Sequence, residues 1–409
     1  MRLLNLVRQF LDDLRAQRLR TALTVLGITW GTVAVVVLLA FGSGLEEQMK
    51  TQARGMGDGI VIVFGGRTTK AFRGFGEGRP IRLRESDVGL LAREIPEIRA
   101  ISPEYGRWEP ARLGTAVTNV YVTGIAPVYG EMRNVIPEPG GRFIDRLDVD
   151  HRRRVAVLGD EVKRTLFGDA DAVGKEFFIG DTPFLVVGVM QKKRQGSSYQ
   201  TRDQNRVFIP ASTHAALFGA RTLSNIVYKP TTPALAPAVR ERVYEVLGRR
   251  YTFDPTDHDA VAIWDTTEMM KMFDYIFLGF NLFLAIVGSF TLTVGGIGVA
   301  NIMYIVVRER TREIGIKRSI GAKRRDILFQ FLFEASLVVA AGAVLGFLVS
   351  FALVELIGML PIQEFVGRAT ISPLVITVTL SLLGVIAALA GLFPARRAAN
   401  LDVVECLRA

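Results

Sequence analysis

Four long segments of this sequence contain no Asp, Glu, Lys, Arg or His, and they are the strongest constraint on its fold. They cover residues 21–45, 275–307, 335–354 and 369–395. Because a helix rises about 1.5 Å per residue, each can cross a hydrocarbon layer about 30 Å thick. Soluble proteins rarely bury helices with 20 uncharged residues in a row. We therefore expect four transmembrane helices. The first is expected to be retained, since its apolar run exceeds the roughly 7–15 residues of a signal peptide.

The second uncharged segment, 275–307, is longer than one span requires. As a single helix it would extend about 50 Å, and residues 266–274 before it also suit a helix. We infer that this helix continues beyond the bilayer as a stalk. An ordinary tilted span with a frayed end is the alternative.

The placement of charge predicts the orientation of the chain. Segments 1–20, 308–333 and 396–409 together carry a net charge of +9, whereas the 229 residues of 46–274 carry only +3. Basic loops face the cytoplasm in most membrane proteins. We therefore expect a multi-pass membrane protein with both termini in the cytoplasm and 46–274 outside it. The total charge of +10 then reports topology and contact with lipids, and no nucleic-acid partner is expected.

The N-terminal segment 1–20 has an amphipathic pattern. Its apolar side chains share one helical face, and they are Leu3, Val7, Phe10, Leu11 and Leu14. Beside a span, such a helix is expected to lie in the membrane interface with its Arg residues toward lipid phosphates. Packing on a partner protein is the alternative.

The large region between the first two spans reads as a mixed domain of short helices and strands. Two strand–helix–strand units bracket a β-rich block. We expect one subdomain built from 46–128 and 220–274, with a second subdomain, 129–219, inserted in it. The strands are expected at 60–64, 98–102, 116–123, 154–158, 176–179, 184–189, 207–209, 226–228 and 261–264. The fold class is thus a membrane protein with four transmembrane α-helices and a large α+β extracytoplasmic domain between helices 1 and 2.

No catalytic or cofactor site is evident in the sequence. The three His have no second His or Cys at metal-ligand spacing, so a zinc site is not expected. The string Gly168–Glu176 resembles a phosphate-binding loop, but Asp169 stands where the first Gly is needed. Glu176 also replaces the Ser or Thr that binds Mg²⁺. We expect no enzyme activity, metal or cofactor in this chain, and any ATP hydrolysis should come from another polypeptide.

The composition of the four predicted spans argues against a pathway for ions or polar substrates through them. Polar transport pathways usually place ionisable residues inside the bundle, and these four segments have none. Gly288, Gly295 and Gly298 lie on one broad face of the second span and suit close helix–helix contact. Lipid-facing glycines are the alternative.

Segment 308–333 carries eight basic residues between the second and third spans. It reads as a basic helix, a break at Gly321 and a second helix beginning near Ala322. Such a structure at the membrane surface suits a cytoplasmic partner that pushes on two spans at once.

This segment closely resembles the permease family of the macrolide exporter MacB and its relatives, the lipoprotein-release and FtsX-like ABC permeases. The resemblance covers nearly the whole chain and is strongest in 294–333 and in the tail. The tail departs slightly from the family pattern. Family members often have Pro where this chain has Val403 or Val404, and Ala where it has Cys406. The matching residues are Gly295–Gly298, Asn301–Met303, Glu309–Lys317, Ile320–Arg324, Pro394–Ala399, Leu401–Glu405, Arg18–Thr21, Leu26–Ile28, Val155–Gly159, Leu166–Gly168 and Val173–Lys175.

The resemblance implies four spans in a bacterial inner (cell) membrane, a split "porter" part with an insertion in the external domain, and use as a dimer. On the spacing noted above, we assign Gly288, Gly295 and Gly298 to transmembrane packing in that dimer. The resemblance also places a coupling helix that meets the ATPase at about 310–326. The residues assigned to ATPase coupling are Arg310, Glu313, Ile314, Lys317, Gly321, Ala322, Lys323 and Arg325. The chain begins 20 residues before the first span, so a separate ATPase subunit is expected.

The function implied is that of the permease subunit of an ABC transporter. ATP and Mg²⁺ in the partner ATPase would drive movements of the extracytoplasmic domain, and thereby export or efflux, by mechanotransmission. The expected partners are the ATPase, a second copy or a related permease, membrane lipids and, as an open option, a periplasmic adaptor protein. An FtsX-like transmembrane signalling subunit that regulates an extracytoplasmic hydrolase is the alternative. A membrane-anchored enzyme is the third hypothesis, and the sequence does not identify the substrate.

Overall fold

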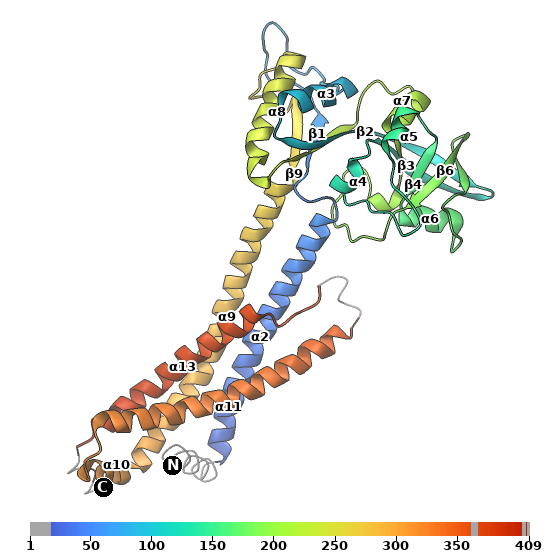
Figure 1. Cartoon of the computed structure of the whole chain (residues 1–409). Helices are drawn as coiled ribbons and strands as arrows, with labels where there is room; N and C mark the ends of the chain where they lie inside the picture. The colour runs from blue at the N-terminus through green and yellow to red at the C-terminus, as the bar shows by residue number, and fades with distance from the viewer. Residues whose placement is uncertain (1–17, 361–366, 403–405, 407–409) are drawn as a thin grey trace. The chain divides into compact units, whose positions relative to one another are not determined.

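The computed structural model describes residues 18–360, 367–402 and 406, and the chain divides into two compact units. The helical unit comprises Met1–Gln48 and Asp274–Ala409, and the α+β unit comprises Met49–Phe273. Most of the predicted amphipathic helix, residues 1–17, lies outside the described residues. The unbroken helices α2 (Arg18–Arg54) and α9 (Thr266–Glu309) each contain residues of both units (Figure 1).

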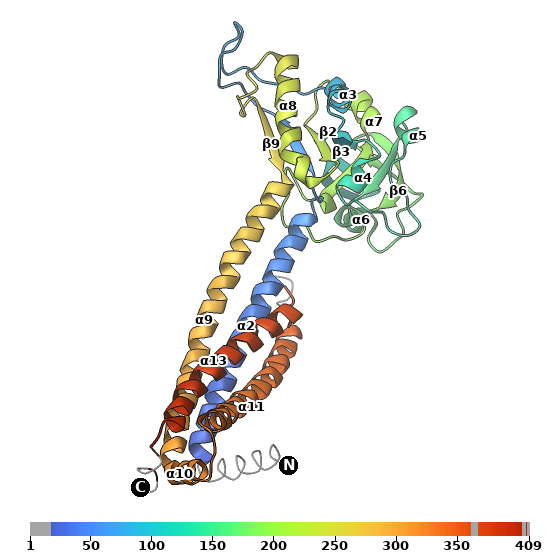
Figure 2. The same ribbon diagram turned by 60° about the vertical axis from the view of Figure 1, so that its left-hand side comes forward.

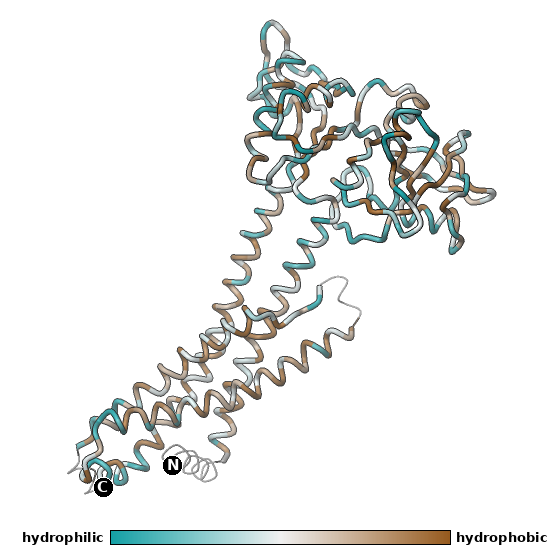
Figure 3. The backbone as a smooth tube through the Cα atoms, viewed as in Figure 1, coloured by the Kyte–Doolittle hydropathy of each residue, from teal (hydrophilic) through white to brown (hydrophobic). Residues whose placement is uncertain are grey.

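The helical unit contains four helices in its described part that are long and apolar enough to cross a membrane. They are α2, α9, α11 (Arg324–Gly358) and α13 (Pro373–Ala399). Hydrophobic residues dominate the four helices in Figure 3, while the α+β unit shows mixed colouring. Helices α11 and α13 run side by side in both ribbon views (Figures 1 and 2). The predicted fold class, four membrane-capable helices with a large α+β domain between the first two, is confirmed.

Two glycines of α11 allow α2 to approach closely. A Cβ on Gly342 would lie 2.6 Å from Ile28 Cγ2, and a Cβ on Gly346 would lie 2.5 Å from Thr32 Cβ. The hydroxyl of Thr29 also donates to the carbonyl of Gly342 at 3.2 Å. Glycines four residues apart are a common device for helix packing in membranes, where backbones gain by close approach.

The α+β unit begins and ends with a ferredoxin-like arrangement. Four strands form antiparallel neighbours in the order β2-β8-β1-β9, and α3 and α8 connect parallel pairs across an intervening strand. Leu91, Val243 and Leu247 of the helices pack against Val61 and Tyr228 of the sheet. The elements are β1 (Val61–Gly65), α3 (Glu85–Glu94), β2 (Ile98–Leu113), β8 (Asn225–Pro230), α8 (Ala236–Tyr251) and β9 (Val261–Asp265).

The inserted part is a closed barrel of six strands. Successive pairings run β2-β3-β7-β4-β6-β5 and return to β2, so the described ring leaves no free edge. Its interior is apolar and includes Val122, Ala156, Phe177 and Val207. The strands are β3 (Ala116–Ile125), β4 (Val155–Leu158), β5 (Glu176–Ile179), β6 (Thr182–Val189) and β7 (Arg206–Pro210). The accompanying helices are α4 (Tyr129–Met132), α5 (Arg146–Asp150), α6 (Asp160–Phe167), η1 (Asp203–Asn205) and α7 (Ala211–Phe218).

Strand β2 is much longer than the predicted strand at 98–102. Its second half contains Pro110 and several charged residues, which hide the alternating pattern of a strand. Ten successive pairs with β3, from Glu104 opposite Ile125 to Leu113 opposite Ala116, hold it extended. The barrel therefore takes in β3 and the second half of β2, which precede the expected subdomain boundary at residue 129.

Helix α7 buries an imidazole that has no hydrogen-bond partner among the described residues. The ring of His214 is 2% exposed, stacks on Tyr105 and contacts Phe218. Burial, assisted by the positive charge of Arg107, lowers the pKa of His214 to about 4. The folded protein therefore holds this side chain neutral at pH values where an unfolded chain would protonate it.

Substituting Gly346 by Ala should destabilise the helical unit, because the new methyl group must displace Thr32. Overpacking of this kind costs about 1–3 kcal/mol. Thermal unfolding of the full chain in detergent measures the effect. Gly384→Ala is the matched control, since a Cβ there meets no atom within 4 Å. Equal melting temperatures for the two variants would contradict the proposed packing.

The His214→Phe variant should reduce the pH dependence of stability. In the parent, the unfolded chain binds a proton near pH 6.5 and the folded protein only near pH 4. Stability is therefore lost as pH falls through this window, by up to about 3 kcal/mol. Denaturant unfolding of the full chain in detergent, followed by tryptophan fluorescence from pH 7 to 4, tests this. The control is His151→Phe, which removes an exposed imidazole, and an unchanged slope in His214→Phe would refute the assignment.

Candidate functional site

The segment between α9 and α11 forms a short helix with a break at each end. Arg310 separates α9 from α10 (Thr311–Ser319), with φ −99° and ψ 16°. Gly321 lies in the turn between α10 and α11 and has φ +104°, a conformation that favours glycine. At the start of α11, a carboxylate oxygen of Asp326 accepts the backbone N–H of Lys323 at 2.9 Å.

A polar network fixes α10 against the first turns of α11. Arg310 Nη1 lies 3.1 and 3.2 Å from the two carboxylate oxygens of Glu334, and these side chains are only 11% and 6% exposed. Gln330 donates to Glu334 at 3.1 Å and accepts from Lys317 at 3.3 Å. Lys317 also pairs with Glu313 at 2.7 Å. Helix α10 therefore follows α11 through charged contacts in addition to apolar packing.

The other inward face of α10 is attached to the end of α13. Ile314 is buried, and a Cβ on Gly315 would lie 2.6 Å from Cys406 Cβ. The guanidinium of Arg318 donates to the carbonyls of Ala399 and Leu401 at 3.2 and 2.8 Å. Helix α10 is thus attached to α11 and α13 by side-chain contacts, and it follows α9 directly in the chain.

The outward face of this segment combines apolar and basic side chains. Ile316 is 45% and Ile320 80% exposed, and Lys323, Arg324 and Arg325 beside them are exposed as well. We call these five residues the α10–α11 surface. Exposed isoleucines beside unburied cations are suited to a protein partner with an apolar pocket and an acidic rim.

The residues predicted to meet an ATPase occupy different positions in this segment. Lys323 and Arg325 belong to the α10–α11 surface, and Gly321 forms the exposed turn beside it. Glu313, Lys317 and Ala322 are partly buried, while Arg310 and Ile314 face inward. The prediction omitted Ile316 and Ile320, although their i,i+4 spacing places them on one helical face. It also omitted Glu334, which borders an uncharged segment and has no sequence signal for pairing with Arg310. Whether these residues contact an ATPase stays a prediction.

The three glycines assigned to transmembrane packing line α9. A Cβ on Gly288 would lie 2.7 Å from Val35 Cγ2, and one on Gly295 would lie 3.0 Å from Ile28 Cδ1. Gly288 and Gly295 therefore pack against α2 of the same chain. A Cβ on Gly298 would meet only Thr24, at 3.8 Å. Packing of these glycines against a second copy stays a prediction.

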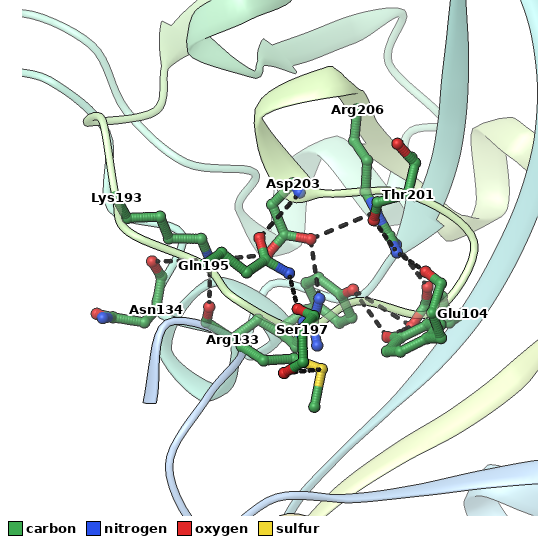
Figure 4. Close-up of polar contacts among 12 residues, drawn as sticks. Glu104, Arg133, Asn134, Lys193, Gln195, Ser197, Thr201, Asp203 and Arg206 are labelled. Carbon is green, nitrogen blue, oxygen red and sulfur yellow. Dashed lines mark hydrogen bonds and ion pairs between the residues drawn. The ribbon is translucent and has the colours of Figure 1, made fainter. Parts of the chain in front are cut away.

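A second polar group, in the α+β unit, buries five charged side chains (Figure 4). We call Glu104, Arg133, Lys193, Asp203 and Arg206 the buried charge cluster. Arg133 donates to Asp203 at 2.8 Å, Lys193 to Asp203 at 2.7 Å and Arg206 to Glu104 at 2.8 Å. All except Lys193 are fully buried. Sequence analysis did not identify this cluster, because its members are distant in sequence and follow no common motif.

The electrostatics of the buried charge cluster keep the carboxylate of Asp203 ionised. Burial alone would raise the pKa of Asp203, but the charges of Arg133, Lys193 and Arg206 outweigh it and hold this pKa well below the ordinary value. Burial lowers the pKa of Lys193, opposed by Asp203. No group of three or more His, Cys, Asp or Glu within the described ranges could hold a metal ion.

Comparison with known proteins finds two families along the chain. The family described as MacB-like periplasmic core domain matches residues 21–246, and that described as FtsX-like permease C-terminal matches residues 285–403.

Individual relatives match over almost the whole chain. The macrolide export ATP-binding/permease protein MacB of Bdellovibrio bacteriovorus is 30% identical, covering 98% of this chain and 61% of that protein. The pyoverdine export ATP-binding/permease protein PvdT of Pseudomonas aeruginosa is 32% identical, covering 99% of this chain and 58% of that protein. The chain thus spans about three-fifths of these relatives. The crystal structure of the periplasmic region of MacB from Actinobacillus actinomycetemcomitans aligns with TM-score 0.44 and 19% identity, covering 54% of this chain and 95% of that one.

Replacing Glu334 by Gln should destabilise the attachment of α10, because Arg310 would keep a buried charge without its carboxylate. Removing one partner of a buried ion pair costs about 3 kcal/mol or more. Thermal unfolding of the full chain in detergent measures this. The control is Glu355→Gln, an exposed carboxylate on the same helix. If both variants melt like the parent, the Arg310–Glu334 pair does not hold this junction.

Proposed function

This chain belongs to the MacB-like and FtsX-like family of ABC transporter permeases, and from that premise we propose that it transmits motion from an ABC ATPase to its α+β unit. The α10–α11 surface is the proposed contact with the ATPase. Arg310, Glu334 and Arg318 would pass displacement of that surface to α9, α11 and α13. Since α9 runs unbroken from Glu309 to Thr266, its movement would reach the strands of the α+β unit directly.

The chemistry of the membrane-capable helices supports mechanotransmission. Their uncharged segments contain no ionisable side chain, so they offer no charged pathway for a hydrophilic substrate. We propose that the substrate is handled by the α+β unit outside the bilayer. The relatives named above are a macrolide exporter and a pyoverdine exporter, and we take organic molecules of these two kinds as the first substrates to test.

The orientation and the partners are further parts of the proposal. The net positive charge of segments 1–20, 308–333 and 396–409 favours a cytoplasmic location for 308–333 and both termini. We propose an ATPase on another chain, and assembly with a second copy of this chain or a related permease. A periplasmic adaptor would be an additional partner. The export names of the relatives do not favour the alternative function as a signalling subunit for a hydrolase.

The observation that carries the proposal is the 80% exposure of Ile320, which follows the end of the attached helix α10 and lies beside the basic residues at the start of α11. The variant Ile320→Glu should reduce recovery of the ATPase with the tagged full chain by about tenfold, the loss typical of an interface anchor. Mild detergent extracts from the native host, mass spectrometry and ATP turnover of the eluate measure this. The matched control is Ile136→Glu, which changes an exposed isoleucine of the α+β unit.

Two outcomes would overturn this function. One is that no ABC ATPase is recovered with the parent chain; recovery of a hydrolase in its place would support the signalling alternative. The other is that Ile320→Glu recovers as much ATPase, with the same ATP turnover, as Ile136→Glu.

A further inference from the structure

The segment 191–202, between β6 and η1, lies directly on the end of α2 within the α+β unit. The N–H of Gly196 donates to the carbonyl of Gln52 at 3.2 Å, and Ser197 Oγ lies 3.9 Å from Met56 Sδ. A Cβ on Gly55 would lie 2.0 Å from the carbonyl oxygen of Arg194. The helix end and this segment therefore meet backbone to backbone, and residue 55 has no room for a side chain.

The opposite side of the same segment is held by the buried charge cluster (Figure 4). Lys193 Nζ donates to Asp203 at 2.7 Å and to the carbonyl of Arg133 at 2.8 Å. Gln195 accepts the backbone N–H of Asp203 at 3.0 Å. Near the end of the segment, Arg206 donates to the carbonyl of Tyr199 at 2.8 Å. The segment is thus fixed by groups at both of its ends.

The cluster in turn bridges the two subdomains of the α+β unit. Glu104 lies on β2, the strand shared by the ferredoxin-like sheet and the barrel, and pairs with Asn225 of β8 on one side and Ile125 of β3 on the other. Arg206 begins β7 of the barrel and binds Glu104. The end of α2 is therefore joined, through 191–202, to the junction of both subdomains.

The energetics of the cluster favour a rigid joint. Three cations surround two carboxylates, only Lys193 among them is partly exposed, and Tyr129 and Tyr199 add hydroxyl donors to Glu104. A buried charge that loses its partner raises the free energy of the folded protein. Breaking one ion pair of the cluster while the others stay formed is therefore unfavourable. The guanidinium of Arg133 also lies 5.0 Å from the ring centroid of Tyr199, which restrains that side chain further.

We propose that segment 191–202 is a permanent clamp, through which the end of α2 and the barrel move as one body during the ATP cycle. Arg133, Lys193, Asp203 and Arg206 are its positioning residues. The clamp gives the mechanotransmission proposed above a route into the barrel, and its role in transport rests on that function.

The first test concerns the clamp itself and needs no partner. Spin labels at Arg54→Cys and Val117→Cys, in a Cys406→Ala background of the full chain, report the separation of the α2 end from the barrel. We expect a narrow distance distribution in the parent. Adding Gly55→Ala should broaden it, because the new Cβ must displace the Arg194 backbone, whereas Gly89→Ala meets no atom within 4 Å and should leave it narrow. A broad parent distribution, or no effect of Gly55→Ala, overturns the clamp.

The second test asks whether the clamp stays closed during turnover. Cysteines at Gln52 and Gly196 would have Cβ atoms 2.9 Å apart, so a shift of a few tenths of an ångström brings them to the roughly 3.5 Å or more of a disulfide across the clamp. In the complex with the copurified ATPase, oxidation should leave the rate of ATP turnover unchanged within about twofold. A change of this size is smaller than the effect of a typical single mutation that alters coupling between two sites. The Arg54–Val117 distances should also be equal with and without a non-hydrolysable ATP analogue.

The outcomes separate the two proposals. Loss of turnover on oxidation that a reducing agent restores, or a nucleotide-dependent change in the Arg54–Val117 distance, overturns the permanent clamp while leaving the transport function intact. Failure to recover any ATPase overturns the proposed function, and the partner-free distance distribution still decides whether the clamp exists.

Discussion

The helical unit depends on a constraint imposed by hydrocarbon: backbone polar groups must be satisfied within each helix, and helices gain little by hiding apolar surface from lipid. Close backbone approach then becomes the main means of fixing one helix on another. Helix α2 meets this requirement on two sides, against Gly342 and Gly346 of α11 and against Gly288 and Gly295 of α9. These contacts define its register against its neighbours.

Charge enters this framework only at the ends of the uncharged segments, and there it fixes α10 in position. The Arg310–Glu334 pair and the Arg318 contacts lie where the uncharged segments stop. A buried pair is a poor source of stability compared with apolar packing, but it is intolerant of small shifts. A short helix held in this way cannot slide freely past α11 or α13. The buried charge cluster of the α+β unit applies the same principle to a β-rich junction.

The sequence was most informative where one local property determines the structure. Absence of charge over 20 or more residues predicted the four helices, because the length of a span is set by the membrane. The break seen at Gly321 was predictable because its backbone conformation is local. The closed barrel was not, since the pairing of β5 with β2 joins residues near 179 and 111. Glu334 and the buried charge cluster were missed for a related reason: burial of a charged residue depends on partners that only the tertiary structure brings near.

Strand β2 has a consequence that its length alone does not suggest. One end of β2 belongs to the ferredoxin-like sheet and the other end is a strand of the barrel, with Glu104 at the transition. If either subdomain unfolded, β2 would lose its pairing partners on that side, and an unpaired strand edge would be left at the boundary of the other subdomain. Although the barrel is an insertion in sequence, it has no thermodynamic independence from its host, and the α+β unit should fold and melt as a single cooperative body.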